Sequence, residues 1–170
     1  MSLSTVFGLP LHPLIVHATV VLVPLAALAV LLHGFLPSAR HRLGLLTVIA
    51  SALAVALVPL SVSSGEQLQK IVGDSRLVER HQELADGMLP WTIGLLVVAV
   101  LLWIRDRRMA SRTIPGDGRP SVRRSLDLLL RPVVLGLLVV VAVVGTGQQV
   151  IRVGHSGAQA AWGDVVTANK

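Results

Sequence analysis

The sequence predicts an all-α integral membrane protein, a bundle of four transmembrane helices. Of its 170 residues, 53% are hydrophobic and only 14% are charged, whereas soluble domains carry about 25% charged residues. The apolar residues gather in four stretches, each close to the roughly 20 residues that cross a bilayer. This length fits a single membrane domain, residues 1–170.

The four predicted spans cover residues 13–36, 43–62, 88–104 and 132–153. Pro13 opens the first span, and proline is tolerated in the first turn of a helix. The third span is short, but Trp91 and Trp103 stand near its two ends. Tryptophan at both interfaces is typical of a full crossing. No basic residue precedes the first apolar run, so we expect no cleaved signal peptide.

The charges of the loops predict the orientation. Loop 37–42 contains Arg40 and Arg42, and loop 105–131 contains eight arginines. Loop 63–87 instead holds five acidic residues against three basic ones. By the positive-inside rule, the arginine-rich loops are cytoplasmic, and loop 63–87 and both termini lie outside a bacterial plasma membrane. This topology accounts for the net charge of +6, and with 3% aromatic residues we expect no nucleic-acid partner.

The outer loop contains a predicted amphipathic helix. Its apolar positions recur at helical spacing, namely Leu77, Val78, His81, Leu84, Ala85 and Met88. His81 therefore falls on the face that turns toward the bundle.

Four of the six histidines, His12, His17, His81 and His155, lie at the span ends predicted to be outside. Imidazole near the hydrocarbon is costly unless it is paired, so this layer suggests a bound ligand. His33 and His41 lie at the opposite ends. With no acidic partner nearby, both are interpreted as interfacial residues.

The histidines of the outer layer differ in their surroundings. His17 lies inside the first span and His155 stands between glycines, which makes them the strongest ligand pair. Pro13 biases His12 toward an extended conformation at the helix margin. Gln148, Arg152 and His155 form a polar stripe at helical spacing. Arg152 either supports a ligand or reaches to the surface.

Several classes of site are excluded. There is no cysteine, so disulfides, thiolate metal sites and covalent haem attachment are ruled out. No acidic residue lies in the predicted spans, which disfavours a pump or transporter. Hydrolase and transferase motifs are also missing, and whether the protein is an enzyme stays open.

The chain resembles the bacterial membrane family catalogued as domain of unknown function 2231, and its actinobacterial members above all. The resemblance rests on segments 8–17 and 21–26, on Ser64-Gly65-Glu66, on His81, and on residues 154–162. It covers essentially the whole chain. It implies four transmembrane helices with the histidines gathered at one side. Some relatives are linked to Rieske-type or cytochrome partners, which implies redox work but no established activity.

The first functional hypothesis is an electron-transfer subunit that holds a non-covalent haem b. Haem iron needs two axial ligands from facing helices, and His17 is chosen with either His155 or His81. Arg152 would pair with a propionate, and Glu66 or Gln148 would orient an imidazole. Glu66 is equally well explained as a solvated acid. The redox partners would be a quinol or membrane oxidoreductase and an external acceptor.

Two alternatives remain open. In the first, a copper, zinc or iron ion is held by His17, His155, His81, His12 and Glu66, which are ordinary ligand types for these metals. In the second, the protein is a non-catalytic membrane subunit whose histidines bridge helices and contact a partner. Small residues would also permit a homodimer.

Overall fold

The computed structural model of the protein describes residues 5–6, 9–73, 75–111 and 131–168, and it confirms the bundle of four long helices. These are α1 (Leu11–Phe35), α2 (Pro37–Val72), α4 (Met88–Ser111) and α6 (Pro132–Ala168). Each is long and apolar enough to span a membrane. Ahead of α1, the short strands β1 (Thr5–Val6) and β2 (Leu9–Pro10) pair antiparallel.

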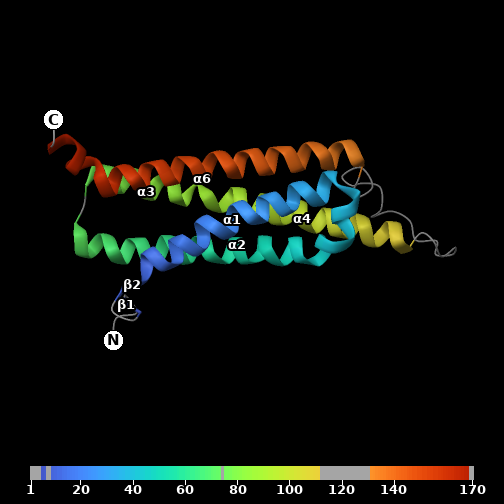
Figure 1. Ribbon diagram of the computed structural model, residues 1–170, viewed down its shortest axis with the longest axis horizontal. Coiled ribbons are helices and arrows are strands. Elements are labelled where there is room, and N and C mark those ends of the chain that lie inside the picture. The colour runs from blue at the N-terminus through green and yellow to red at the C-terminus, as the bar shows by residue number, and fades with distance from the viewer. Residues whose placement is uncertain (1–4, 7–8, 74, 112–130, 169–170) are drawn as a thin grey trace.

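The four long helices form a ring in the order α1, α2, α4, α6. In Figure 1, α1 and α4 run in one direction and α2 and α6 run in the other. The chain therefore begins and ends at the same end of the bundle. The turn from α1 to α2 lies at the opposite end, together with the end of α4 and the start of α6.

The helices are longer than the predicted spans. Pro37 stands in the first turn of α2, which bends at Gly44 and has Gly73 as its C-cap residue. Gly73 has a φ of 88°, which residues with a side chain rarely adopt. The predicted loops 37–42 and 63–87 are therefore largely helical. Similarly, α4 continues to Ser111 through the first residues of the predicted loop 105–131. The rest of that loop, up to residue 130, lies outside the described residues.

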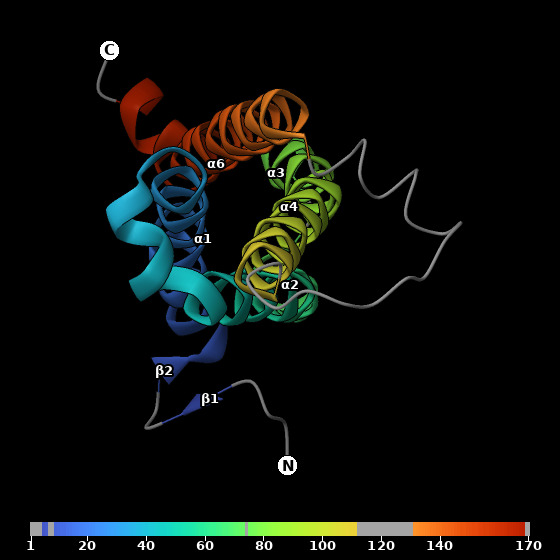
Figure 2. The same ribbon diagram turned by 90° about the vertical axis from the view of Figure 1, so that its right-hand side faces the viewer.

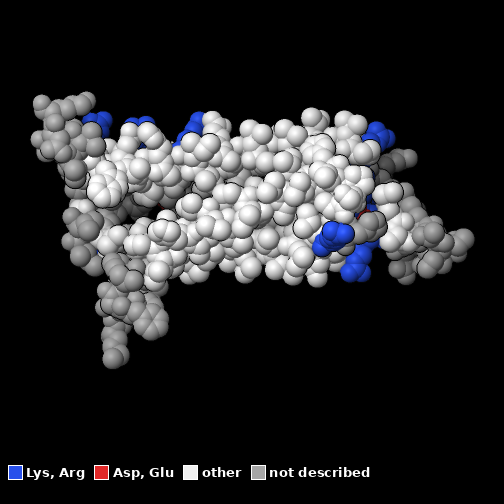
Figure 3. Space-filling model, viewed as in Figure 1, with Lys and Arg blue, Asp and Glu red and all other residues white. Residues whose placement is uncertain are grey.

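The outer face of the bundle is apolar. Val133 and Ile151 on α6 are 73% and 72% exposed, and Leu46 on α2 is 60% exposed. On the face shown in Figure 3, the middle of the bundle carries no charged side chain. Such a belt is stable only against lipid, so the protein is a multi-pass membrane protein.

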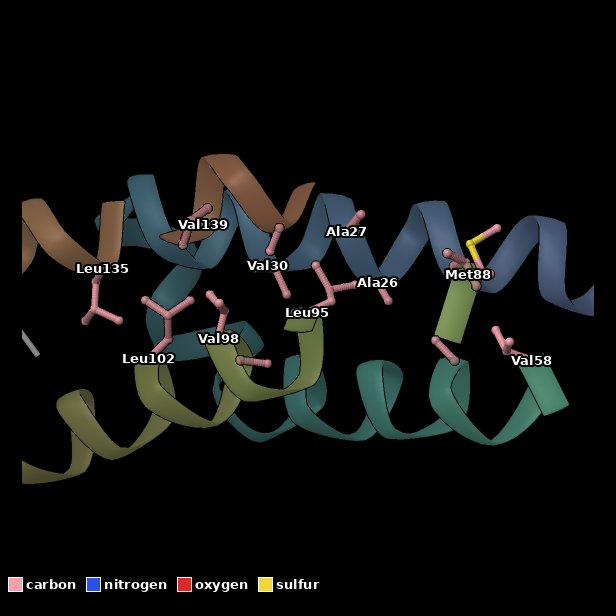
Figure 4. Packing of buried hydrophobic residues seen from close by; sticks show 14 residues of the cluster. Ala26, Ala27, Val30, Val58, Met88, Leu95, Val98, Leu102, Leu135 and Val139 are labelled. Atoms are coloured by element: carbon pink, nitrogen blue, oxygen red, sulfur yellow. The ribbon is translucent and has the colours of Figure 1, made fainter. Parts of the chain in front are cut away.

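The buried residues follow stripes in which spacings of three and four alternate. This spacing is typical of left-handed helix bundles. The stripes are Thr19, Val23, Ala26, Val30 and His33 on α1; Met88, Thr92, Leu95, Ala99 and Leu102 on α4; and Leu135, Val139, Ala142, Thr146, Gln149 and Ser156 on α6. Figure 4 shows Val30, Leu95 and Val98 meeting in the apolar middle. Polar side chains occupy the ends of the stripes, and these ends hold the candidate sites.

The predicted amphipathic helix of the outer loop is α3 (Arg76–Asp86). The Ser75 hydroxyl caps it by accepting a hydrogen bond from the Val78 N–H, 3.3 Å away. Buried Gln149 of α6 donates a hydrogen bond of 2.6 Å to the Leu84 carbonyl. This bond holds α3 against α6 (Figure 1) and so fixes the position of His81.

Candidate functional site: two serine-bound histidines

His12, at the start of α1, lies against the end of α2. Its Nδ1 is 3.0 Å from the Ser64 Oγ. The next residue, Gly65, leaves room for the imidazole. A Cβ at Gly65 would lie 3.1 Å from the Cε1 of His12. A serine and a glycine of α2 therefore form a fitted seat for this ring.

His81, on α3, occupies an equivalent seat at the end of α6. Its Nδ1 is 3.0 Å from the Ser156 Oγ. A Cβ at Gly157 would lie 3.0 Å from the Cε1 of His81. The His–Ser–Gly arrangement is thus built twice, once by each half of the chain.

The serines determine which nitrogen of each imidazole carries the proton. The Ser64 Oγ donates to the Ser61 carbonyl at 2.9 Å, and the Ser156 Oγ donates to the Val153 carbonyl at 2.9 Å. A hydroxyl has one proton, so each Oγ is left to accept from its histidine. In the neutral rings, Nδ1 therefore carries the proton and Nε2 keeps its lone pair. Histidines that bind metals are held by a second hydrogen bond in the same way.

The two seats lie at the same end of the bundle. His12 and His81 are both half-buried, and they are close enough for their charges to interact. Here Figure 3 shows the surface hollowed between the upper helices, which include α6, and the lower pair α1 and α2. Two helical turns along α1 from His12, the Thr19 hydroxyl is hydrogen-bonded to the Ser61 hydroxyl of α2 at 2.7 Å. The arrangement offers two pre-oriented imidazoles at one end of the bundle.

A protein-family model described as "Predicted membrane protein (DUF2231)" matches residues 8–170. The chain belongs to this family. The match includes both histidine seats and all four long helices, so the resemblance noted in the sequence is confirmed. No curated protein and no solved structure matches the chain.

In this DUF2231 chain, the histidines favoured as ligands by the sequence lie elsewhere. His17 is exposed on α1, and its Nδ1–H donates to the Pro13 carbonyl at 2.6 Å. His155 is exposed on α6, beside the buried Ser156. Instead, the structure holds His12 and His81 in equivalent serine seats at the same end of the bundle. Within the described residues, no hydrogen bond joins His17 or His155 to either seat.

The predicted supporting residues are also exposed. Gln148 and Arg152 lie on α6 and Glu66 lies on α2, all near the same end as the two seats. The buried amide of α6 is Gln149, which the sequence analysis did not single out. No group of three or more histidine or acidic residues suited to a metal ion occurs within the described residues.

The interpretation of His33 as an interfacial residue without an acidic partner is wrong. Its side chain is fully buried, and its Nε2 lies 2.8 Å from the Asp106 Oδ2. Its Nδ1 lies 3.2 Å from the Thr47 Oγ1. Asp106 belongs to α4, which continues past the predicted end of the span and carries the carboxylate onto the buried stripe. The side chain of His41 lies outside the described part of the chain.

Proposed function

We propose that the protein is a membrane electron-transfer subunit that binds haem b between His12 and His81. The observation that carries this proposal is the duplicated seat, which presents two Nε2 lone pairs at one end of the bundle. Two axial imidazoles satisfy haem iron, and helical bundles commonly supply them from facing helices. Bound haem would supply one-electron chemistry.

The ligand number favours haem over a bare metal ion. Zinc and copper sites in proteins usually need three or more protein ligands. Within the described residues, no such cluster of histidine and acidic residues is found. Two imidazoles are incomplete for those ions but complete for a porphyrin iron, whose other four ligands are its own.

The remaining groups at this end suit the periphery of such a site. Arg152 is exposed on α6 and would supply a cation for a propionate. The predicted orientation places the site at the outer face of a bacterial plasma membrane. We therefore propose electron transfer from a quinol or a membrane oxidoreductase to an external acceptor such as a cytochrome or Rieske-type protein.

The test is a haem titration of the purified full-length chain in neutral detergent. We expect a saturable Soret band with one haem per chain, and the spectrum of a low-spin, bis-imidazole iron. Metal analysis of the protein as isolated runs in parallel. Stoichiometric copper or zinc without porphyrin would overturn the haem proposal in favour of an ion site. No cofactor by either measurement would favour a structural subunit.

The serines of the two seats provide a graded prediction. Ser64→Ala or Ser156→Ala removes the acceptor that holds the Nδ1 proton, so the ring can rotate and change tautomer. Loss of such a supporting group typically weakens metal affinity about 10–100-fold, and we expect the same range for haem. Ser63→Ala is the matched control, because Ser63 is exposed and its hydroxyl donates to the Leu60 carbonyl of its own helix. Equal affinities for all three variants would contradict the assigned role of the serines.

A further inference from the structure

The opposite end of the bundle contains a cavity of about 210 Å³ where α1, α4 and α6 meet the start of α2. Two arginines, Arg40 and Arg105, line one part of it, and Pro132 at the first turn of α6 lies beside them. The remaining wall is apolar and includes Phe35 and Leu102. The cavity thus combines two cationic side chains with an apolar wall.

One hydrogen-bond donor of Arg40 is bonded, and another has no partner within the described residues. Its Nη2 donates to the Gly34 carbonyl at 3.2 Å, which orients the guanidinium. Its Nε is buried and has no partner within the described residues. A buried donor without an acceptor costs free energy, and an anion at this position would satisfy it.

The surroundings leave this positive charge without a counterion in the described structure. Asp106 is the only carboxylate among the described residues at this end, and it is bonded to His33. The arginine fork matches the geometry of a phosphate oxygen pair.

We propose that this cavity binds the phosphate of an anionic phospholipid. The cavity lies at the ends of the membrane-spanning helices, which is the level of the headgroups. Phe35 lines the cavity and is 50% exposed, so the cavity opens toward the lipid-facing surface. A free phosphate would use the same arginines but not this apolar wall. This inference concerns a different end of the bundle from the histidine site and does not depend on the proposed function.

The test measures the thermal unfolding midpoint of the full chain in neutral detergent with added phosphatidylglycerol, phosphatidylcholine or inorganic phosphate. A ligand at about one hundred times its Kd is expected to raise the midpoint by about 5–11 °C. We expect this rise with phosphatidylglycerol, little with phosphatidylcholine, and none with phosphate at equal concentration. An equal rise with inorganic phosphate would overturn the lipid assignment, and no rise with phosphatidylglycerol would overturn the site itself.

Two variants and one control locate the effect. Arg40→Gln removes the oriented cation and is expected to abolish most of the phosphatidylglycerol shift. Gly136→Leu adds an apolar side chain to the cavity lining without changing charge, and it is also expected to abolish most of the shift. A Cβ at this position would lie at an ordinary 3.8 Å from the Phe35 ring, so the backbone tolerates the change. Arg42→Gln removes the same charge from an exposed position two residues along α2 and is expected to keep the shift. Equal shifts in Arg40→Gln and Arg42→Gln would mean that the response to phosphatidylglycerol comes from surface charge alone. That result would refute the proposal.

Discussion

Replacing Asp106 with alanine is expected to lower the free energy of unfolding by about 3 kcal/mol, because it leaves the buried His33 imidazole without its hydrogen-bond partner. His33 is fully buried and its Nε2 has the Asp106 carboxylate at 2.8 Å as its partner. Without it, this buried nitrogen loses its hydrogen-bond partner. The unfolding midpoint in detergent should fall by roughly 6–12 °C for a chain of this size.

Two further variants separate the hydrogen bond from the charge. Asp106→Asn keeps an acceptor oxygen in place, so we expect about half the loss or less. The double variant His33→Leu with Asp106→Leu removes both partners, and such replacements are often neutral or stabilising. Glu79→Ala on exposed α3 controls for the loss of an acidic residue. If the double variant is as unstable as Asp106→Ala, the stranded imidazole is not the cause.

The fold could be predicted because bilayer crossing constrains the sequence strongly. Four apolar stretches with a tryptophan at each end of the third span predicted four helices, and the structure has four long ones. The spacing of Leu77, His81 and Leu84 likewise predicted α3. The ends of the helices were harder to predict, because hydropathy marks the hydrocarbon region and helices continue into the interface. Thus α2 reaches Val72 and α4 reaches Ser111.

From the sequence, the site could be predicted only as a layer of histidines at one end of the bundle. Which histidines face inward could not be predicted from their position in that layer. On α6, Gln148, Arg152 and His155 form one stripe, and Gln149, Val153 and Ser156 form the next, one residue along. The buried stripe continues from Leu135 and Val139 at spacings of three and four, and extending that spacing would have placed Ser156 inside and His155 outside. On α1, counting back from Thr19 by the same spacings of three and four residues reaches His12 and does not reach His17.

The buried histidine pair shows a different limit. Asp106 lies four residues after Leu102 on the inward stripe of α4, so its position was encoded in the spacing. The two arginines beside it, Arg105 and Arg107, indicated a loop, and a loop acid is ordinarily solvated. In the structure the helix continues, Arg107 lies over the Trp103 ring at 4.9 Å, and Asp106 turns inward to His33. Charge density alone therefore did not locate the helix end.

His12→Ala or His81→Ala is expected to abolish the haem spectrum that the proposed function requires. Each substitution removes one of two axial ligands, and neither leaves a nearby imidazole with a serine-held Nδ1 to replace it. We expect the Soret titration to lose its low-spin form and the affinity to fall by about 100-fold or more. Both residues are half-buried and bond to a single serine side chain each, so the fold should survive, as circular dichroism and the unfolding midpoint would verify.

His17→Ala and His155→Ala are the matched controls, because they remove histidines from the same end of the bundle. Both side chains are exposed, and the His17 Nδ1–H bonds to the carbonyl of Pro13 on its own helix. Their haem affinity should therefore stay within about two-fold of the unmodified chain. The opposite result, loss of haem with His17→Ala or His155→Ala and retention with His12→Ala and His81→Ala, would return the ligand role to the pair that the sequence favoured. It would also require these ends of α1 and α6 to rotate by about 100° about their axes, the angle between successive residues of a helix.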